Sequence, residues 1–303
     1  GVKGNADLVA YFLLRAHALL NETGQMGLIA TNTLAQGDTR EVGLDQIVEE
    51  GTTIRRAIKS APWPSASAML EYCAVWTSRA HVSEEGEKNL DGVVVPGITS
   101  SLMPRSRVTG NPRRLAANAR IAFQASKIDG LGFTLSKEEA LSLIEEDPRN
   151  SEVLFPFING RDLNSRPDCS GSRWIINFFD MSESQASQYR KPFEQVLRLV
   201  KPEREKNNRS TRRDRWWQYG ERAPKLYEAI AGLERVIALT RVSKVVMPVM
   251  VPTGQVISER VVVFATDDTA MLALLSSAPH YWWALTRSST LETRVLYTLS
   301  DVF

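Results

Sequence analysis

Cysteine and histidine are scarce in this chain of 303 residues. It has two cysteines, Cys73 and Cys169, and three histidines, His17, His81 and His280. Two cysteines are too few for a disulfide framework or a structural zinc cluster, and histidines this scattered lack the spacing of metal ligands. We therefore expect neither disulfides nor a metal site, and we take a reducing cytosol, hence a cytoplasmic location, as the default.

Long apolar runs and repeats are also missing from the sequence. No stretch approaches the roughly 20 consecutive apolar residues that a membrane-spanning helix needs, and no unit recurs along the chain. Hydrophobic residues make up 43% of the chain and charged residues 24%, a composition too apolar for disorder. The sequence therefore predicts an ordinary globular protein that neither crosses a membrane nor forms fibres.

The net charge of +2 hides a gradient of charge along the chain. Residues 1–100 carry 8 basic and 12 acidic side chains, whereas residues 201–303 carry 15 basic and 11 acidic ones. The two ends therefore differ in sign, and the excess of positive charge lies towards the C-terminal end.

The N-terminal third alternates between helical and strand patterns. Apolar residues at helical spacing predict helices, and short apolar or β-branched runs bounded by turn residues predict strands. We predict a mainly parallel α/β sheet whose last two strands pair antiparallel. The predicted elements are a helix over 6–20, a strand over 26–31, a helix over 44–50, and strands over 53–58 and 68–77.

The remainder of the chain predicts a connector and then a mixed domain. Ser136 and Glu139 form a capping box that opens a helix ending near Glu146. We predict domain boundaries at 1–91, 92–150 (the connector) and 151–303. Other predicted elements are a surface loop over 81–91, a strand over 174–179, a long helix that a second capping box of Ser182 and Gln185 opens, a helix over 226–233, and a strand pair over 245–251 and 256–265 joined at 252–254.

A set of short motifs follows in fixed order along the chain. The motifs are Phe123-Gln124-Ala125-Ser126, Gly130-Leu131-Gly132-Phe133, Pro156-Phe157-Ile158-Asn159-Gly160-Arg161-Asp162-Leu163, Arg215-Trp216-Trp217 and Tyr297-Thr298-Leu299-Ser300-Asp301-Val302-Phe303. The set resembles bacterial adenine-N6 DNA methyltransferases of single-chain restriction–modification systems (type IIG-like) and related phage-defence methylases. The resemblance runs from about residue 6 to the end of the chain.

The resemblance implies a fold class and a division of labour. Residues 1–91 would be the C-terminal half of an S-adenosylmethionine-dependent methyltransferase domain, an incomplete Rossmann-like α/β sheet. Residues 151–303 would be a mixed α+β target-recognition domain that binds a specific double-stranded DNA sequence. The family's Asn-Pro-Pro-Tyr/Phe signature and its glycine-rich cofactor loop would precede residue 1, so the partners would include the missing N-terminal half of the parent chain.

Two consequences follow from that reading of the chain as a fragment. The fragment alone is expected to transfer no methyl group and to bind no cofactor, although the parent enzyme would use S-adenosylmethionine. The strand at 26–31 is expected to have an unpaired edge and an uncovered apolar face, which invites pairing with a second copy or distortion of the sheet.

One aromatic residue is a candidate for holding an extruded adenine. In the resembling enzymes an aromatic just before the last sheet strand looks like one jaw of a clamp on the flipped base, and here it would be Trp63. The alternative is a loop tryptophan that covers the sheet edge. Asn32 and Thr33 follow the first strand where α/β sheets place ligands, although a turn role is equally open.

The run from 201 to 215 carries seven basic and three acidic side chains, and it predicts a helix that becomes a flexible loop. Such a run is typical of an element that follows DNA phosphates, although a solvated, partly paired face is the alternative. Trp216 and Trp217 are expected to anchor the loop to a core. The basic residues of the run are Lys201, Arg204, Lys206, Arg209, Arg212, Arg213 and Arg215.

Reading a DNA sequence requires side chains that reach base edges. Polar residues at turns between apolar strands meet this requirement, and the resemblance points to the same regions, although each could instead be an ordinary surface residue. The candidates are Arg241, Ser243, Lys244, Ser258, Glu259, Arg260, Glu292 and Arg294, and Arg161 is a further predicted DNA contact.

Two other readings of the chain remain open. It could be a stand-alone DNA-binding specificity subunit that lends recognition to a partner enzyme and has no catalysis of its own. It could also be an unrelated cytosolic enzyme that uses His17 or His280, but both are more readily packing residues, because no serine or cysteine partner has a recognisable setting.

Overall fold

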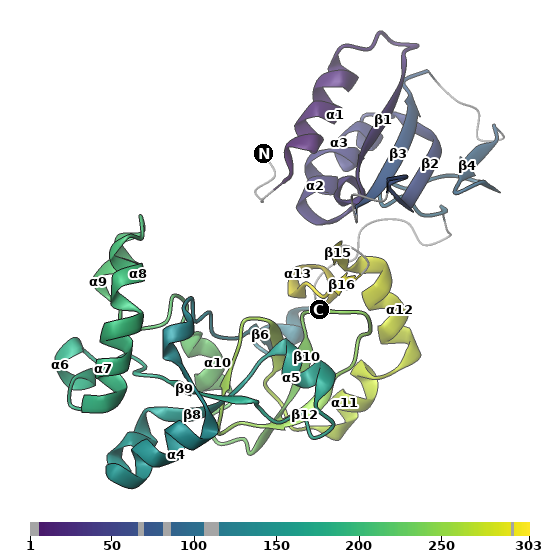
Figure 1. The fold of residues 1–303 in the computed structure, drawn as a ribbon. Helices are drawn as coiled ribbons and strands as arrows, with labels where there is room; N and C mark the ends of the chain where they lie inside the picture. Colours follow the sequence, from purple (N-terminus) through teal and green to yellow (C-terminus); the bar gives the residue numbers. More distant parts are fainter. Residues whose placement is uncertain (1–5, 66–69, 81–85, 106–114, 292–293) are drawn as a thin grey trace. The chain divides into compact units, whose positions relative to one another are not determined.

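The computed structural model describes residues 6–65, 70–80, 86–105, 115–291 and 294–303. The chain divides into two compact units, shown in Figure 1. Unit 1 comprises residues 1–114 and 285–302, and unit 2 comprises residues 115–284 and 303. Residues 92–150, for which a connector is predicted, lie partly in unit 1 and partly in unit 2, where 122–124 and 134–135 are strands.

Unit 1 contains the helices and strands predicted for the N-terminal third, with shifted ends, and a helix at 37–42 that was not predicted. Asp7 caps the first helix by accepting a hydrogen bond from the Val9 amide at 3.4 Å. The elements are α1 (Leu8–Ala18), β1 (Gln25–Thr31), η1 (Asn32–Ala35), α2 (Gly37–Val42), α3 (Leu44–Glu49), β2 (Thr53–Pro62), β3 (Glu71–Ser78), β4 (Lys88–Leu90), β5 (Val93–Val95), β15 (Ser289–Leu291), β16 (Arg294–Leu296) and α13 (Leu299–Val302).

The main sheet of unit 1 has the strand order β1-β3-β2-β4-β5. The predicted antiparallel pairing of β2 with β3 is confirmed, but the prediction of a mainly parallel sheet is wrong. Because β3 lies between β1 and β2 and runs against both, only the β2–β4 pair is parallel. The predicted surface loop over 81–91 is wrong at 88–90, which form β4 and bury Leu90; residues 81–85 lie outside the described part.

The two faces of this sheet differ in what covers them. Helices α1 to α3 gather on one side (Figure 1), where Leu13, Leu44 and Val75 join one buried core. On the other face Ile29 is 61% exposed and Trp76 is 37% exposed. β1 is also terminal in the strand order, so one of its edges has no partner strand among the described residues.

Unit 2 holds two four-stranded sheets, ordered β12-β10-β14-β6 and β13-β8-β9-β7. Its elements are η2 (Ala116–Asn118), β6 (Ala122–Gln124), η3 (Leu131–Phe133), β7 (Thr134–Leu135), α4 (Lys137–Glu146), η4 (Pro148–Glu152), β8 (Leu154–Ile158), α5 (Gly160–Ser165), β9 (Arg173–Ile176), α6 (Glu183–Ala186), α7 (Arg190–Leu199), α8 (Lys201–Glu205), α9 (Ser210–Asp214), α10 (Pro224–Ala229), β10 (Arg235–Thr240), β11 (Val242–Ser243), β12 (Val249–Pro252), β13 (Val256–Ile257), β14 (Val261–Phe264), α11 (Thr269–Leu275) and α12 (Ala278–Arg287), which continues into unit 1.

The capping boxes predicted in unit 2 are both present. Ser136 and Glu139 exchange hydrogen bonds at the start of α4, and Ser182 and Gln185 do the same at the start of α6. The long helix predicted from Ser182 is wrong, however, because the backbone of Tyr189 leaves the helical region before α7 begins.

The predicted pairing of 245–251 with 256–265 is also wrong. β10, which the sequence reading missed, lies between β12 and β14 and pairs antiparallel with both. The short strand β13 pairs instead with β8, in parallel. β10 thus forms the centre of its sheet, and its residues Val236 to Thr240 are all buried.

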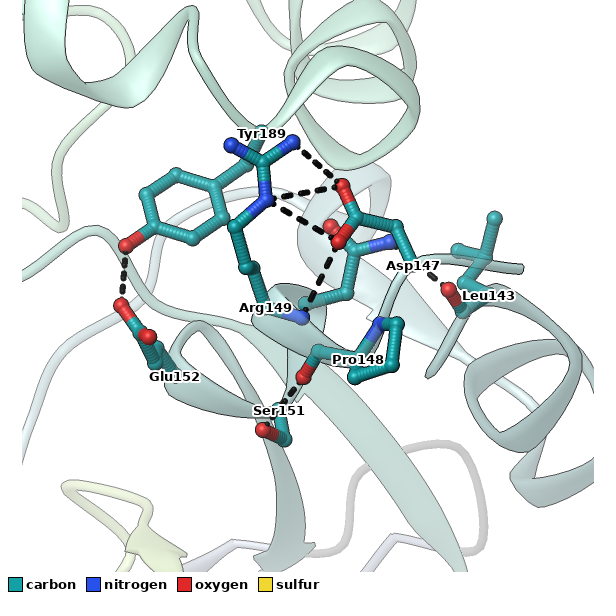
Figure 2. Close-up of polar contacts among 8 residues, drawn as sticks. Leu143, Asp147, Pro148, Arg149, Ser151, Glu152 and Tyr189 are labelled. Atoms are coloured by element: carbon teal, nitrogen blue, oxygen red, sulfur yellow. Dashed lines mark hydrogen bonds and ion pairs between the residues drawn. The ribbon is translucent and has the colours of Figure 1, made fainter. Parts of the chain in front are cut away.

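A polar network fixes the segment between α4 and β8 (Figure 2). Asp147 accepts from the Arg149 amide at 3.1 Å and from its guanidinium at 2.7 Å, and the hydroxyl of Tyr189 donates to Glu152 at 2.5 Å. The bond to Arg149 lowers the pKa of Asp147, and the bond to Glu152 raises the pKa of Tyr189. These contacts tie η4 to the start of α7 and give the network a structural role.

Candidate nucleic-acid interface

Three segments of unit 2 meet at the C-terminal end of β10. The Arg241 amide donates to the Arg260 carbonyl at 2.8 Å, which joins the turn after β10 to the turn before β14. The Thr240 hydroxyl donates to the Gly160 carbonyl at 3.4 Å, which adds the start of α5. The structure thereby brings together five of the predicted site residues, called here the β10-end cluster: Arg161, Arg241, Lys244, Glu259 and Arg260.

The start of α5 is built so that Arg161 has a fixed position. The side chain of Asn159 accepts from the amides of Arg161 at 2.8 Å and Asp162 at 3.2 Å, and Asp162 accepts in return from the Asn159 amide at 3.1 Å. A Cβ at Gly160 would lie 2.9 Å from the Thr240 side chain, so glycine is what permits this close approach.

The side chains of the β10-end cluster leave this backbone scaffold towards solvent. Arg161, Lys244 and Arg260 are exposed, and the side chain of Arg260 is 68% exposed. The Arg260 Nε lies 3.6 Å from Glu259, which also accepts a hydrogen bond from Ser258 at 3.0 Å. The arrangement presents three exposed cations and one carboxylate. The cations can donate to acceptors on base edges, and the carboxylate can accept from donors there.

Two amide side chains at the same end were not predicted as site residues. Gln124 on β6 donates to the Glu259 carbonyl at 3.5 Å, and Asn164 on α5 accepts from Ser243 at 3.3 Å. Both are exposed. Gln124 belongs to a motif quoted above for the resemblance, but its sequence position gave no sign that it would reach the turn before β14.

The basic run over 201–215, called here the basic arm, is helical in both halves. α8 and α9 extend to one side of unit 2 in Figure 1, and the predicted flexible loop is wrong over 210–214, where α9 forms. Within the part of the chain that the structure describes, Lys206, Arg209 and Arg215 are exposed and form no ion pair. Arg213, also exposed, lies 3.5 Å from Asp214.

Two arginines of the basic arm face inwards instead. Arg204 is 3% exposed, and its guanidinium donates to the carbonyls of Ile128 and Asp129, each at 2.9 Å. Burial lowers the pKa of Arg204. Arg212 forms an ion pair with Asp129, packed against Gly220, where a Cβ would clash with the Asp129 carboxylate. Both guanidinium groups hold the loop at 128–129 against the arm, so neither is presented to a phosphate.

The aromatic residues at the end of the arm anchor it to the core of unit 2, as expected. Trp216 and Trp217 are buried, and the Trp217 indole N–H donates to the Met181 carbonyl at 2.9 Å. Lys201 lies over the ring of Trp216, 5.1 Å from its centroid. The arm is therefore anchored to the core of unit 2, and its exposed cations without an ion pair among the described residues are Lys206, Arg209 and Arg215.

Trp63 lies in unit 1, just after β2, and is 42% exposed. Its amide donates to the Leu70 carbonyl at 2.8 Å, and its ring meets Tyr72 edge-to-face with centroids 5.6 Å apart. Asn32, which follows β1, is buried nearby and hydrogen-bonded to Ser60. Trp63 is thus partly exposed while its indole contacts Tyr72.

The remaining predicted site residues lie apart from the β10-end cluster in the chain. Arg294 is on β16 of unit 1, and Glu292 lies outside the described residues. His17 is buried and bonded to Thr52 at 2.8 Å, and His280 contacts the Leu275 carbonyl at 2.6 Å, so both have packing roles.

Neither a metal site nor a membrane span emerges from the described ranges. No three His, Cys, Asp or Glu side chains there are grouped to hold a metal ion. Over the same residues, every helix is too short or too polar to cross a bilayer.

The fold is shared with part of a restriction–modification enzyme. The type IIL restriction–modification enzyme MmeI, solved in complex with DNA, aligns over 99% of this chain with a TM-score of 0.78 and 17% identity. This chain spans 42% of the length of that enzyme. The type IIG restriction endonuclease BpuSI aligns over 94% of this chain and 39% of its own, with 12% identity and a TM-score of 0.30, too low to support an argument.

The sequence itself settles the family. A profile of the MmeI target recognition domain matches residues 103–302, and the chain belongs to this family. A search of curated proteins finds no match. The matched range includes the β10-end cluster and the basic arm, and the predicted link to restriction–modification enzymes is confirmed.

Proposed function

We propose that this chain binds double-stranded DNA and recognises a specific sequence, as part of an adenine-N6 DNA methyltransferase of the restriction–modification type. The observation that carries the proposal is the convergence of Arg161, Arg241 and Arg260 at one end of β10. The backbones of Arg241 and Arg260 are joined by a hydrogen bond, the Thr240 hydroxyl binds the Gly160 carbonyl next to Arg161, and the side chains of Arg161 and Arg260 reach solvent. Recognition needs this combination, because base edges are read by side chains held in a fixed register.

The two basic regions of unit 2 have different tasks in this proposal. The β10-end cluster reads base edges, with arginine suited to guanine and the amides of Gln124 and Asn164 suited to adenine. The basic arm contacts phosphates through Lys206, Arg209, Arg213 and Arg215, which adds affinity without sequence information. Lys201, Arg204 and Arg212 support the arm from inside. Arg294 and Glu292 remain predicted contacts.

The methyltransferase part of the proposal concerns the parent enzyme. Trp63 would stack on the extruded adenine, and such a stack is typically worth about 1–3 kcal/mol per base. S-adenosylmethionine would be the parent's methyl donor. In the described residues β1 leads into the short helix Asn32–Ala35 rather than a glycine-rich turn, so no residue of this chain is assigned to the cofactor.

Selection of bound duplexes from a random pool, at two salt concentrations, tests the proposal. We expect a consensus that persists at the higher salt, because base contacts depend less on counterion release than phosphate contacts do. Replacing both Arg161 and Arg260 with alanine should erase the consensus while some salt-sensitive binding remains. Binding without any consensus would refute sequence recognition, and no binding at all would refute the proposal as a whole.

A further inference from the structure

The side chains of Asn32, Ser60 and Glu71 meet just after β1, near the end of the hairpin where β2 ends and β3 begins. The Asn32 Nδ2 donates to Glu71 Oε2 at 3.1 Å and to Ser60 Oγ at 3.2 Å, and the Ser60 hydroxyl donates to the same Glu71 oxygen at 2.7 Å. Asn32 is 8% exposed. One carboxylate oxygen therefore accepts hydrogen bonds from two other segments of the chain, which holds the Glu71 side chain in place.

The backbone shows why these three residues meet. Strand β2 is irregular between Ile58 and Ala61, and this bulge includes Ser60. Beyond the bulge, Pro62 pairs with Glu71. Trp63 is therefore the residue that follows the pairing partner of Glu71. Bulges redirect side chains beside functional sites, and here the redirected hydroxyl completes the Glu71 bonds.

The same carboxylate stands next to the aromatic pair. Tyr72 follows Glu71 and pairs with Thr31 of β1 on one side and Ala61 of β2 on the other. Its ring meets Trp63 at an interplanar angle of 87°. The hydrogen bonds of Glu71 to Asn32 and Ser60 therefore hold the start of β3, which carries Tyr72. Because the Tyr72 ring packs against Trp63, these bonds also hold the ring that Trp63 contacts.

We propose that Glu71 is a positioning residue that, through Asn32 and Ser60, holds the Trp63–Tyr72 pair so that the exposed indole of Trp63 can stack on an extruded purine. This inference rests on the proposed function, because the stacked base is the adenine of bound DNA. Glu71 touches no base in this role. It acts by keeping the indole plane in one orientation, which lowers the ordering cost of stacking.

The experiment uses the chain labelled with 5-fluorotryptophan and observed by ¹⁹F NMR. The chain has seven tryptophans, and Trp63→Phe assigns the Trp63 signal. In free protein we expect Glu71→Ala to shift and broaden that signal. Glu71→Gln, which keeps an acceptor oxygen in place, should preserve it, and Glu87→Ala is the matched control because Glu87 is an exposed carboxylate of unit 1. Ser60→Ala, which removes one donor, should give an intermediate shift and stands in if Glu71→Ala does not fold.

The second stage adds a duplex with one adenine opposite an abasic site, which lowers the energy needed to extrude the base. The wild-type Trp63 signal should shift more with this duplex than with the fully paired one, and Glu71→Ala should lose that difference while fluorescence anisotropy still reports DNA binding. An unchanged Trp63 signal in free Glu71→Ala overturns the positioning role, whatever DNA does. A wild-type Trp63 signal that ignores bound DNA overturns the stacking role and leaves sequence recognition standing.

Discussion

The basic arm makes a quantitative prediction about salt. Seven cations lie in the run, but only Lys206, Arg209, Arg213 and Arg215 are exposed, so the arm should neutralise four phosphates rather than seven. Each neutralised phosphate contributes about −0.9 to the slope of log affinity against log salt, giving about −3.6 for the arm. Raising salt from 50 to 200 mM should therefore cost roughly 150-fold in affinity through the arm alone.

Replacing Lys206 and Arg209 with alanine should halve that contribution. The slope should become shallower by about 1.8, so that the arm's share of the same change in salt costs roughly 12-fold. Fluorescence anisotropy on a fixed duplex, titrated at four or more salt concentrations, measures the slope. Arg190→Ala with Arg235→Ala is the control, because it removes the same charge from exposed positions outside the arm and should leave the slope unchanged.

Replacing Arg212 distinguishes the cations of the basic arm that contact DNA from those that support the arm from inside. Arg212 belongs to the basic run that the sequence predicts to follow DNA phosphates, and loss of such a contact would weaken binding to all DNA sequences alike. Because Arg212 is paired with Asp129, Arg212→Ala should instead lower the melting temperature and leave the salt slope unchanged. Equal slopes for the wild type and the Lys206/Arg209 variant would refute the reasoning, as would a slope that changes with Arg212.

Three further predictions concern other parts of the chain. Arg260→Ala should relax the selected consensus at one base pair, a loss of about 1–3 kcal/mol of discrimination, whereas Arg235→Ala at the opposite end of β10 should leave the consensus intact. Burial lowers the pKa of His17 below its ordinary value of 6.5, so the folded state binds a proton there less readily than the unfolded chain does, and stability should fall as the pH drops below about 6.5. Thermal melts from pH 7.5 to 5 should show that the melting temperature of His17→Gln depends less on pH than that of the wild type. An identical pH dependence of the two melting temperatures would contradict this role of His17. Calorimetry with S-adenosylmethionine should show no saturable micromolar binding to this chain, and a clear isotherm would overturn the expectation that the chain binds no cofactor.

Local signals predicted the elements that depend on local chemistry. Capping boxes at Ser136 and Ser182 placed two helix starts correctly, because the residues that form a box lie within one turn of each other. β10 was missed since its apolar run follows a helical pattern directly, and a short buried strand cannot be told from a buried helix by periodicity. The order of strands in the first sheet was beyond local signals, because it depends on pairings between distant segments.

The candidate interface, too, is partly predictable from local sequence and partly dependent on contacts between distant segments. The sequence predicted that the basic run would contact DNA, but in that run Arg204 and Arg209 look alike. What distinguishes Arg204 is the loop at Ile128 and Asp129, about 75 residues earlier, whose carbonyls accept hydrogen bonds from its guanidinium. The predicted readers Arg161, Arg241 and Arg260 were chosen singly, and only the fold shows that they share one end of β10.

The scaffold of the β10-end cluster has a consequence for how specificity can change. Its joints are backbone bonds, such as Arg241 to Arg260 at 2.8 Å and Ser258 to Ile158 at 3.0 Å, together with the close approach at Gly160. Side chains at 161, 241 and 260 can therefore be exchanged without removing one of these backbone hydrogen bonds. A library randomised at these three positions should stay largely folded, so new DNA preferences are reachable by single substitutions, with the glycine as the position that must stay constant.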